Sequence, residues 1–199
     1  MGMLELFSWK REREVYYYDT GKNREWKEFA SHLFEMMTEE MRRGKKRGIV
    51  VLCIGTDRST GDSLGPLIGY KLKELGVRRV QVIGTLERPV HAMNLESYLS
   101  MIRLAYPEAL VIAVDASVGK AEYIGYATLG IGALKPGLGV SKDLEAVGDI
   151  FITGIVASGG NGSPEMLQSI RLSVVMGMAD YISKSIYLVE KLWDSPATV

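Results

Sequence analysis

The chain has 199 residues, 47% of them hydrophobic, and its 24 basic and 24 acidic side chains give a net charge of zero. This length predicts one domain with an ordinary core, and the balanced charge argues against a nucleic-acid-binding protein. No early segment resembles a signal peptide and no run approaches a membrane span, while the single cysteine, Cys53, indicates a reducing compartment. We therefore expect a cytoplasmic protein that binds neither nucleic acid nor membrane.

The first part of the chain divides into an arm and a helix. Residues 1–23 mix charged and aromatic side chains without a repeat, so we expect an extended or irregular arm, followed by a single α/β domain over 24–199. From Trp26 to Met41 apolar residues recur at helical spacing, and the basic run 42–47 suits the C-terminal end of that helix.

The stretch from Arg47 to Gly69 organises the rest of the chain. Residues 49–54 are apolar and mostly β-branched, without alternation, which is typical of a central strand buried on both faces of a parallel sheet. A polar loop follows, and Pro66 is expected at the first position of a helix that ends at Gly76. Ligands of open α/β sheets bind at the carboxyl ends of strands, so this loop is the first candidate for a functional site.

The loop does not fit either of two nucleotide-binding motifs. Gly55 and Gly61 enclose five residues, and Asp62 stands where a phosphate-binding loop has its lysine. Glycines at the spacing of the dinucleotide fingerprint are also missing. The alternative that Asp57 and Asp62 are only turn and helix-capping residues stays open.

The remaining elements alternate between strands and helices. We expect strands at 79–85, 109–114 and 148–156, an added strand or hairpin arm within 122–130, a glycine-rich loop at 130–139, and helices at 94–106 and from Ser163 to about Trp193. This order predicts an α/β fold, a three-layer α/β/α sandwich with a mostly parallel central sheet.

Further candidate residues follow these strands. Glu87 and His91 come after the second strand and could face the same crevice as Asp62. Asp115 directly follows the third strand, where packing does not explain a carboxylate, because an isolated buried charge is expensive. Ser117 and Lys120 suggest a serine–lysine pair as a further alternative, although their spacing outside a helix does not fix its geometry.

Two motifs carry a family resemblance: Gly61-Asp62-Ser63-Leu64-Gly65-Pro66 in the loop and Val114-Asp115-Ala116 at the strand end. Together with the strand at 148–156, they resemble the YyaC-type sporulation proteins, relatives of the germination protease of spore-forming bacteria. The resemblance runs from about Arg47 to the last helix. It implies that Asp62 and Asp115 are the catalytic pair.

The resemblance also implies the phosphorylase/hydrolase-like fold shared with hydrogenase-maturation endopeptidases. In those enzymes a similar acidic pair, with a histidine, holds a metal. The corresponding strand of this chain offers Phe151, which cannot bind a metal. We therefore expect no metal and no cofactor, as in the germination protease.

Two neighbouring carboxylates can share one proton, so one acts as base and the other as acid in peptide hydrolysis. We expect an endopeptidase that acts on a protein or peptide substrate during sporulation; the alternative is a non-catalytic protein that binds a peptide or small molecule in the same crevice. A homo-oligomer is left open. Helix N-terminal amides near Leu64 and Gly65 are expected to stabilise an oxyanion. The complete set of expected supporting or substrate-binding residues is Asp57, Ser63, Leu64, Gly65, Glu87, His91 and Ser117.

Overall fold

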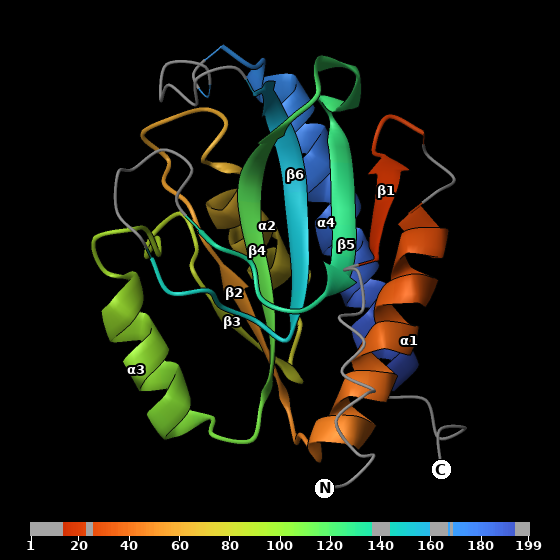
Figure 1. The fold of residues 1–199 in the computed structure, drawn as a ribbon, viewed down its shortest axis with the longest axis vertical. Coiled ribbons are helices and arrows are strands. Elements are labelled where there is room, and N and C mark those ends of the chain that lie inside the picture. Colours follow the sequence, from red (N-terminus) through yellow and green to blue (C-terminus); the bar gives the residue numbers. More distant parts are fainter. Residues whose placement is uncertain (1–13, 23–25, 137–143, 160–166, 168, 194–199) are drawn as a thin grey trace, which may run out of the picture.

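The structure of the protein is a computed structural model that describes residues 14–22, 26–136, 144–159, 167 and 169–193. Within these ranges six strands form one sheet (Figure 1). The strands are β1 (Val15–Asp19), β2 (Ile49–Cys53), β3 (Val80–Ile83), β4 (Leu110–Gly119), β5 (Tyr126–Ile131) and β6 (Ile150–Ser158). The helices are α1 (Trp26–Gly44), α2 (Leu64–Glu74), α3 (Leu95–Ala105) and α4 (Leu172–Trp193), with a short 3-10 helix, η1 (Ala121–Tyr123).

The helices cover both faces of the sheet. Alternate residues of β2 point to opposite faces: Val51 belongs to the core under α1, α2 and α4, and Leu52 belongs to the core under α3. All five residues of β2 are buried, which explains why this strand shows no alternation of apolar and polar residues. The predicted three-layer α/β/α sandwich is therefore confirmed.

The sheet is mixed, in the order β1-β5-β6-β4-β2-β3. β2, β3, β4 and β6 are parallel, and β5 pairs antiparallel with both β6 and β1. The chain passes from β2 to β3 through α2 on one face and from β3 to β4 through α3 on the other. The winding therefore changes direction between β2 and β4, at the kind of switch point where doubly wound folds bind ligands.

Two strands differ from the expected elements. Residues 15–19 of the expected arm form β1, an edge strand paired with β5. β4 does not end before Asp115 but continues to Gly119, because residues 115–119 pair with β6, with an irregularity between Ser117 and Val118. Asp115 consequently lies inside a strand.

Two helices begin at positions other than those expected. α2 begins at Leu64, so Pro66 is its third residue; the missing proline N–H costs little there, because first-turn amides have no partner within the helix. α4 begins only at Leu172, after the non-helical residues 169–171. The expected cap, Ser163, lies outside the described residues, as does part of the expected glycine-rich loop.

By length and composition alone, α4 could cross a membrane, with 22 residues and a hydropathy of 1.2, contrary to the expectation that no run approaches a span. Half of its apolar window is buried within the fold. The helix packs against α1 and α2, and Asp180 on it forms an ion pair of 2.7 Å with Lys71 of α2. These contacts are those of a core helix.

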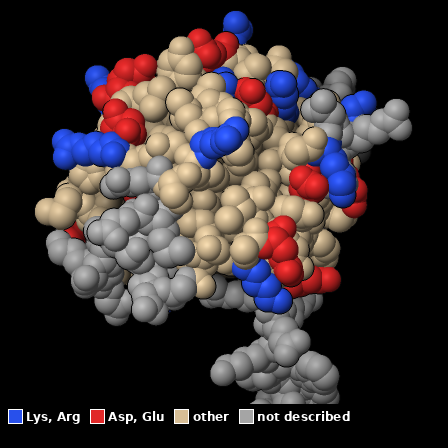
Figure 2. Space-filling model, turned by 90° about the horizontal axis from the view of Figure 1, so that it is seen from above, with Lys and Arg blue, Asp and Glu red and all other residues tan. Residues whose placement is uncertain are grey.

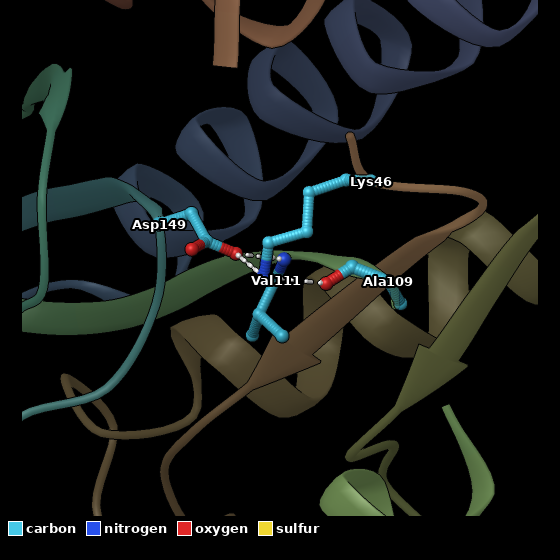
Figure 3. A network of polar contacts seen from close by, with 4 residues as sticks. All are labelled: Lys46, Ala109, Val111 and Asp149. Carbon is cyan, nitrogen blue, oxygen red and sulfur yellow. Dashed lines mark hydrogen bonds and ion pairs between the residues drawn. The ribbon is translucent and has the colours of Figure 1, made fainter. Parts of the chain in front are cut away.

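Polar contacts close the amino-terminal end of the sheet (Figure 3). One carboxylate oxygen of Asp149 accepts hydrogen bonds from the Val111 N–H at 2.8 Å and from Lys46 Nζ at 3.3 Å. Lys46 Nζ also donates to the Ala109 carbonyl at 3.2 Å. These bonds tie the start of β4 to the chain segments that lead into β2 and β6.

Candidate aspartate site

Hydrogen bonds join three chain segments at the carboxyl end of β2. The Ile54 N–H donates to the Val114 carbonyl at 2.7 Å, and the Gly55 N–H donates to the Val90 carbonyl at 2.8 Å. The end of β2 is thereby fixed to β4 on one side and to the segment after β3 on the other. The residues that follow these positions, including Asp115 and His91, are brought to the same edge of the sheet.

Close backbone contacts hold Asp62 beside the end of β2. Its carbonyl accepts the Thr56 N–H at 3.1 Å, and a Cβ on Gly55 would lie only 2.0 Å from the same carbonyl oxygen. Gly55 also has φ +142°, a conformation that other residues rarely adopt. A Cβ on Gly65 would lie 2.0 Å from the Ile54 carbonyl oxygen, so this glycine allows α2 to start against the strand. Two glycines therefore set the position of the aspartate loop.

The Asp62 side chain is half-buried, and this burial raises the pKa of its carboxyl above the usual value. The N-cap position of α2 belongs to Ser63, which makes no side-chain capping bond. Asp62 is thus not the cap of α2. Asp57, in contrast, is exposed in a turn, where the turn-residue interpretation suffices.

The Asp115 side chain is buried, with 8% of the residue exposed. Its neighbours Val114 and Ala116 belong to the core under α1, α2 and α4, so alternation places Asp115 on the α3 side of the sheet. Its Oδ1 accepts the Ala116 N–H at 2.8 Å, and Thr153 of β6 is its partner in register. Asp62 in the loop after β2 and Asp115 in β4 therefore lie on the two sides of the switch point.

Ser117 lies two residues beyond Asp115 on the same face of β4. Its hydroxyl donates to Thr153 Oγ1 at 3.0 Å and reaches the Gly154 carbonyl at 3.3 Å. The hydroxyl is thus engaged by β6, which does not favour a serine–lysine pair with Lys120. Sequence reasoning missed Thr153, because a threonine in a strand is ordinary.

The expected supporting residues at the start of α2 are used within the loop itself. The Leu64 N–H donates to the Gly61 carbonyl at 3.3 Å, and the Leu64 side chain is fully buried. Ser63 is also buried, and its hydroxyl donates to the Thr60 carbonyl at 2.6 Å. Together with Gly65, these residues shape the loop.

Glu87 and His91 occupy different environments. Glu87 is exposed, and hydrogen bonds from its own backbone N–H and from Thr85 lower its pKa. His91 is half-buried beside Val90, which binds Gly55, and its Nδ1 accepts the Met93 N–H at 3.3 Å. His91 is therefore the better placed of the two, and the contact between Val90 and Gly55 had no signal in the sequence.

The residue at the position where the family resemblance implies a metal-binding histidine is Phe151, which cannot bind a metal. Phe151 is buried in the core under α3 and brings no ligand. In the part of the chain that the structure describes, no three His, Cys, Asp or Glu side chains gather as a metal-binding group.

Charges on the end of the molecule seen from above are scattered (Figure 2). Lysine and arginine side chains alternate with aspartate and glutamate around a centre that is mostly uncharged. Neither sign dominates this face among the residues coloured there. The described surface on this side gives no preference for a strongly charged partner.

Fold and site together define an α/β protein with two aspartates at the switch point of its sheet. The chain belongs to the family DUF1256, described as a protein of unknown function, which matches residues 17–185. It is 44% identical over 162 residues to the uncharacterized protein YyaC of Bacillus subtilis (strain 168), covering 81% of this chain and 79% of that protein. The expected relation to YyaC-type proteins is confirmed. Among solved structures, a NiFe hydrogenase maturation protease, HycI from Thermococcus kodakarensis KOD1, is similar with a TM-score of 0.49 and 20% identity, over 80% of this chain and 99% of that one.

Proposed function

We propose that the protein is an endopeptidase that uses Asp62 and Asp115 to hydrolyse a peptide bond in a protein or peptide substrate. The observation that supports this proposal is that Asp62 follows β2 and Asp115 lies in β4, the adjacent parallel strand, at the switch point of the sheet. The resemblance of both aspartate motifs to those of the germination protease supports the same roles.

We assign the role of acid to Asp62 and the role of base to Asp115. Burial raises the pKa of Asp62, which suits it to donate a proton. Asp115 then acts as the base: it takes a proton from water, and the water oxygen attacks the peptide carbonyl carbon. Asp62 gives its proton to the leaving nitrogen as the C–N bond breaks. Proton exchange between the carboxyls, or with solvent, restores the starting state.

The motif resemblance also suggests where the enzyme acts. We place it in the cytoplasm of a spore-forming bacterium, with a substrate that is processed during sporulation. The proposed chemistry needs no cofactor.

A second candidate function is binding without cleavage. The observation that favours it is the Leu64 amide, an expected oxyanion donor, which is already bonded to the Gly61 carbonyl. A crevice without a free donor at this position can hold a peptide but stabilises a tetrahedral intermediate less well. In this alternative the protein retains the fold and captures a peptide or small molecule.

Cleavage of a proteome-derived peptide library tests the two functions. The purified full chain is incubated with the library over a broad pH range, and new peptide ends are identified by mass spectrometry. We expect the wild type to produce ends with a consistent sequence preference, and Asp115→Asn to lose them while still retaining peptides. Asp180→Asn is the matched control, since Asp180 lies on α4 in an ion pair with Lys71.

The control variant should cleave like the wild type. Cleavage that survives in Asp115→Asn would remove the catalytic role of this residue. Capture of peptides by wild type and Asp115→Asn alike, with no new ends at any pH, would instead establish the binding function.

A further inference from the structure

A groove of about 500 Å³ lies on the sheet surface beside Asp115, lined by residues of β1, β4, β5, β6 and η1. Its volume falls within the roughly 300–1,000 Å³ of ligand sites. We propose that this groove is a substrate subsite that holds a large apolar side chain, preferably an aromatic one, of an extended polypeptide bound across Asp115. This inference rests on the proposed function and names the class of substrate that the site prefers.

Two residues of the groove lining are neighbours of Asp115 in the sheet. Thr153, in its lining, is the partner of Asp115 in the β4–β6 register. Ser117, also in the lining, lies two residues beyond Asp115 on the same face of β4. A polypeptide with its scissile bond at Asp115 would therefore place a neighbouring side chain over β6.

Apolar and aromatic groups form most of the walls of the groove, and Lys120 is also in its lining. Tyr17 of β1 is 52% exposed although it is large, and its ring lies 5.1 Å from that of Tyr123 at an angle of 40°. Ile155 of β6 adds a buried aliphatic surface. Tyrosine walls of this kind favour an aromatic guest, because ring pairs add to the free energy of burying apolar area.

Hydroxyl groups form a polar floor. Ser117 donates to Thr153 Oγ1 at 3.0 Å, and Thr153 and Thr128 share a hydrogen bond of 2.7 Å. The Ser117 O–H is used by Thr153 Oγ1 and the Gly154 carbonyl, and the contact between Thr153 and Thr128 uses a second O–H, so one O–H of the trio is left by these contacts. The trio can therefore offer a hydrogen bond to a backbone carbonyl of the polypeptide, while the walls hold its side chain.

A polypeptide guest explains the combination of walls and floor. A single exposed tyrosine on an edge strand is common and is not by itself evidence of a binding site. Here the exposed Tyr17 stands beside a chain of hydroxyls in one cavity that borders the buried Asp115. A small polar ligand would leave the aromatic walls unused, and a purely apolar one would not use the remaining O–H of the hydroxyl chain.

Peptide binding to Asp115→Asn tests this inference without cleavage. The probes are acetyl-Gly-Gln-Phe-Gln-Gly amide and the same peptide with Ala in place of Phe, titrated by NMR to millimolar concentration against the full chain. We expect the Phe peptide to bind at least about tenfold more tightly, as burial of an aromatic ring predicts. Its addition should shift the amide signals of Ser117 and Thr153.

Variants of the wall assign the preference to the groove. Tyr17→Ala should reduce the ratio of the two affinities to below about threefold, and Tyr17→Phe should keep it, because the ring and not the hydroxyl makes the wall. Tyr70→Ala, on α2 and outside the groove, is the matched control and should also keep the ratio.

Equal binding of the two peptides, no binding of either, or a preference that persists in Tyr17→Ala would overturn the inference. None of these outcomes concerns turnover, so each leaves the test of the catalytic pair unaffected. Conversely, a wild type that cleaves nothing but prefers the Phe peptide through Tyr17 would retain the subsite and reject the peptidase.

Discussion

The two ends of the sheet use carboxylates in different ways. At the amino end, Asp149 binds Lys46 and the Val111 N–H, and buried Glu190 accepts the N–H groups of Arg78 and Arg79 at 2.6 and 2.7 Å. At the carboxyl end, burial raises the pKa of Asp62.

The difference shows which carboxylates hold the fold together and which suggest chemistry. An aspartate that accepts hydrogen bonds from a lysine and a backbone amide joins chain segments and stabilises the structure. An aspartate whose ionised form is disfavoured by burial lowers stability at neutral pH, and such groups cluster at functional sites. Asp149 and Glu190 therefore have structural roles, whereas Asp62 has the properties of a functional residue.

The largest expected effect concerns turnover. If Asp62 and Asp115 act as a unit, each Asn variant should lower the cleavage rate by about 10²–10⁴-fold, and the double variant should lose little more. Asp149→Asn should leave the rate per folded molecule unchanged. Initial rates on one cleaved peptide, corrected for the folded fraction, measure this. If the fold-losses in rate of the two single variants multiply in the double variant, Asp62 and Asp115 act independently.

The second effect concerns the glycine that seats α2. Gly65→Ala should destabilise the fold by about 2–3 kcal/mol, because the new Cβ would lie 2.0 Å from the Ile54 carbonyl oxygen. Gly177→Ala on α4 is the matched control, since no atom lies within 4 Å of its Cβ position, and it should stabilise the fold by about 0.5–1 kcal/mol. Urea unfolding compares the two. Equal free energies of unfolding would show that α2 does not require this close contact.

A smaller effect is expected at the amino end. Asp149→Asn removes the ion pair with Lys46 but keeps an acceptor for the Val111 N–H, so we expect a loss of about 1–2 kcal/mol. Asp180→Asn, whose ion pair has one side chain 48% exposed, should cost less. Thermal unfolding of both variants at neutral pH shows which substitution costs more stability. A smaller loss for Asp149→Asn would contradict the structural role of this residue.

The smallest effect is a pH dependence of stability. The pKa of Asp62 is raised in the fold, so the stabilisation of its neutral form is complete below the usual value of 3.8 and is lost as the pH rises through the raised pKa. The stability of Asp62→Asn relative to the wild type should therefore increase from acid to neutral pH. Urea unfolding at several pH values measures the difference. A difference that falls with pH would mean that the carboxylate is stabilised in the fold.

Much of the fold was predictable because buried parallel strands leave a strong pattern. The apolar runs of β2 and β4 and the polar residues after them indicated adjacent parallel strands, and the structure confirms this. The extension of β4 beyond Asp115 was not predictable, because pairing with β6 decides it rather than the small polar residues themselves. The pairing of β1 with β5 likewise joins segments that are far apart in the sequence.

The candidate site was predictable only in part. Two motifs pointed to Asp62 and Asp115, and both lie at the switch point of the sheet. The sequence could not show that Leu64 and Ser117 are engaged by neighbours, because those bonds depend on loop and sheet geometry. It also gave no signal for Thr153, whose importance comes from its register with Asp115.

Carboxyl NMR titration of the two aspartates tests the central claim most directly. With ¹³C-labelled aspartate, the signals of Asp62 and Asp115 are followed with pH in the wild type and in each Asn variant. A catalytic pair predicts that the pKa of Asp62, which burial raises, falls when Asp115→Asn removes the second carboxylate, because two carboxyls that share a proton raise each other's pKa. An Asp62 that titrates like an ordinary aspartate, or whose titration is the same with and without the Asp115 carboxylate, would contradict a catalytic pair.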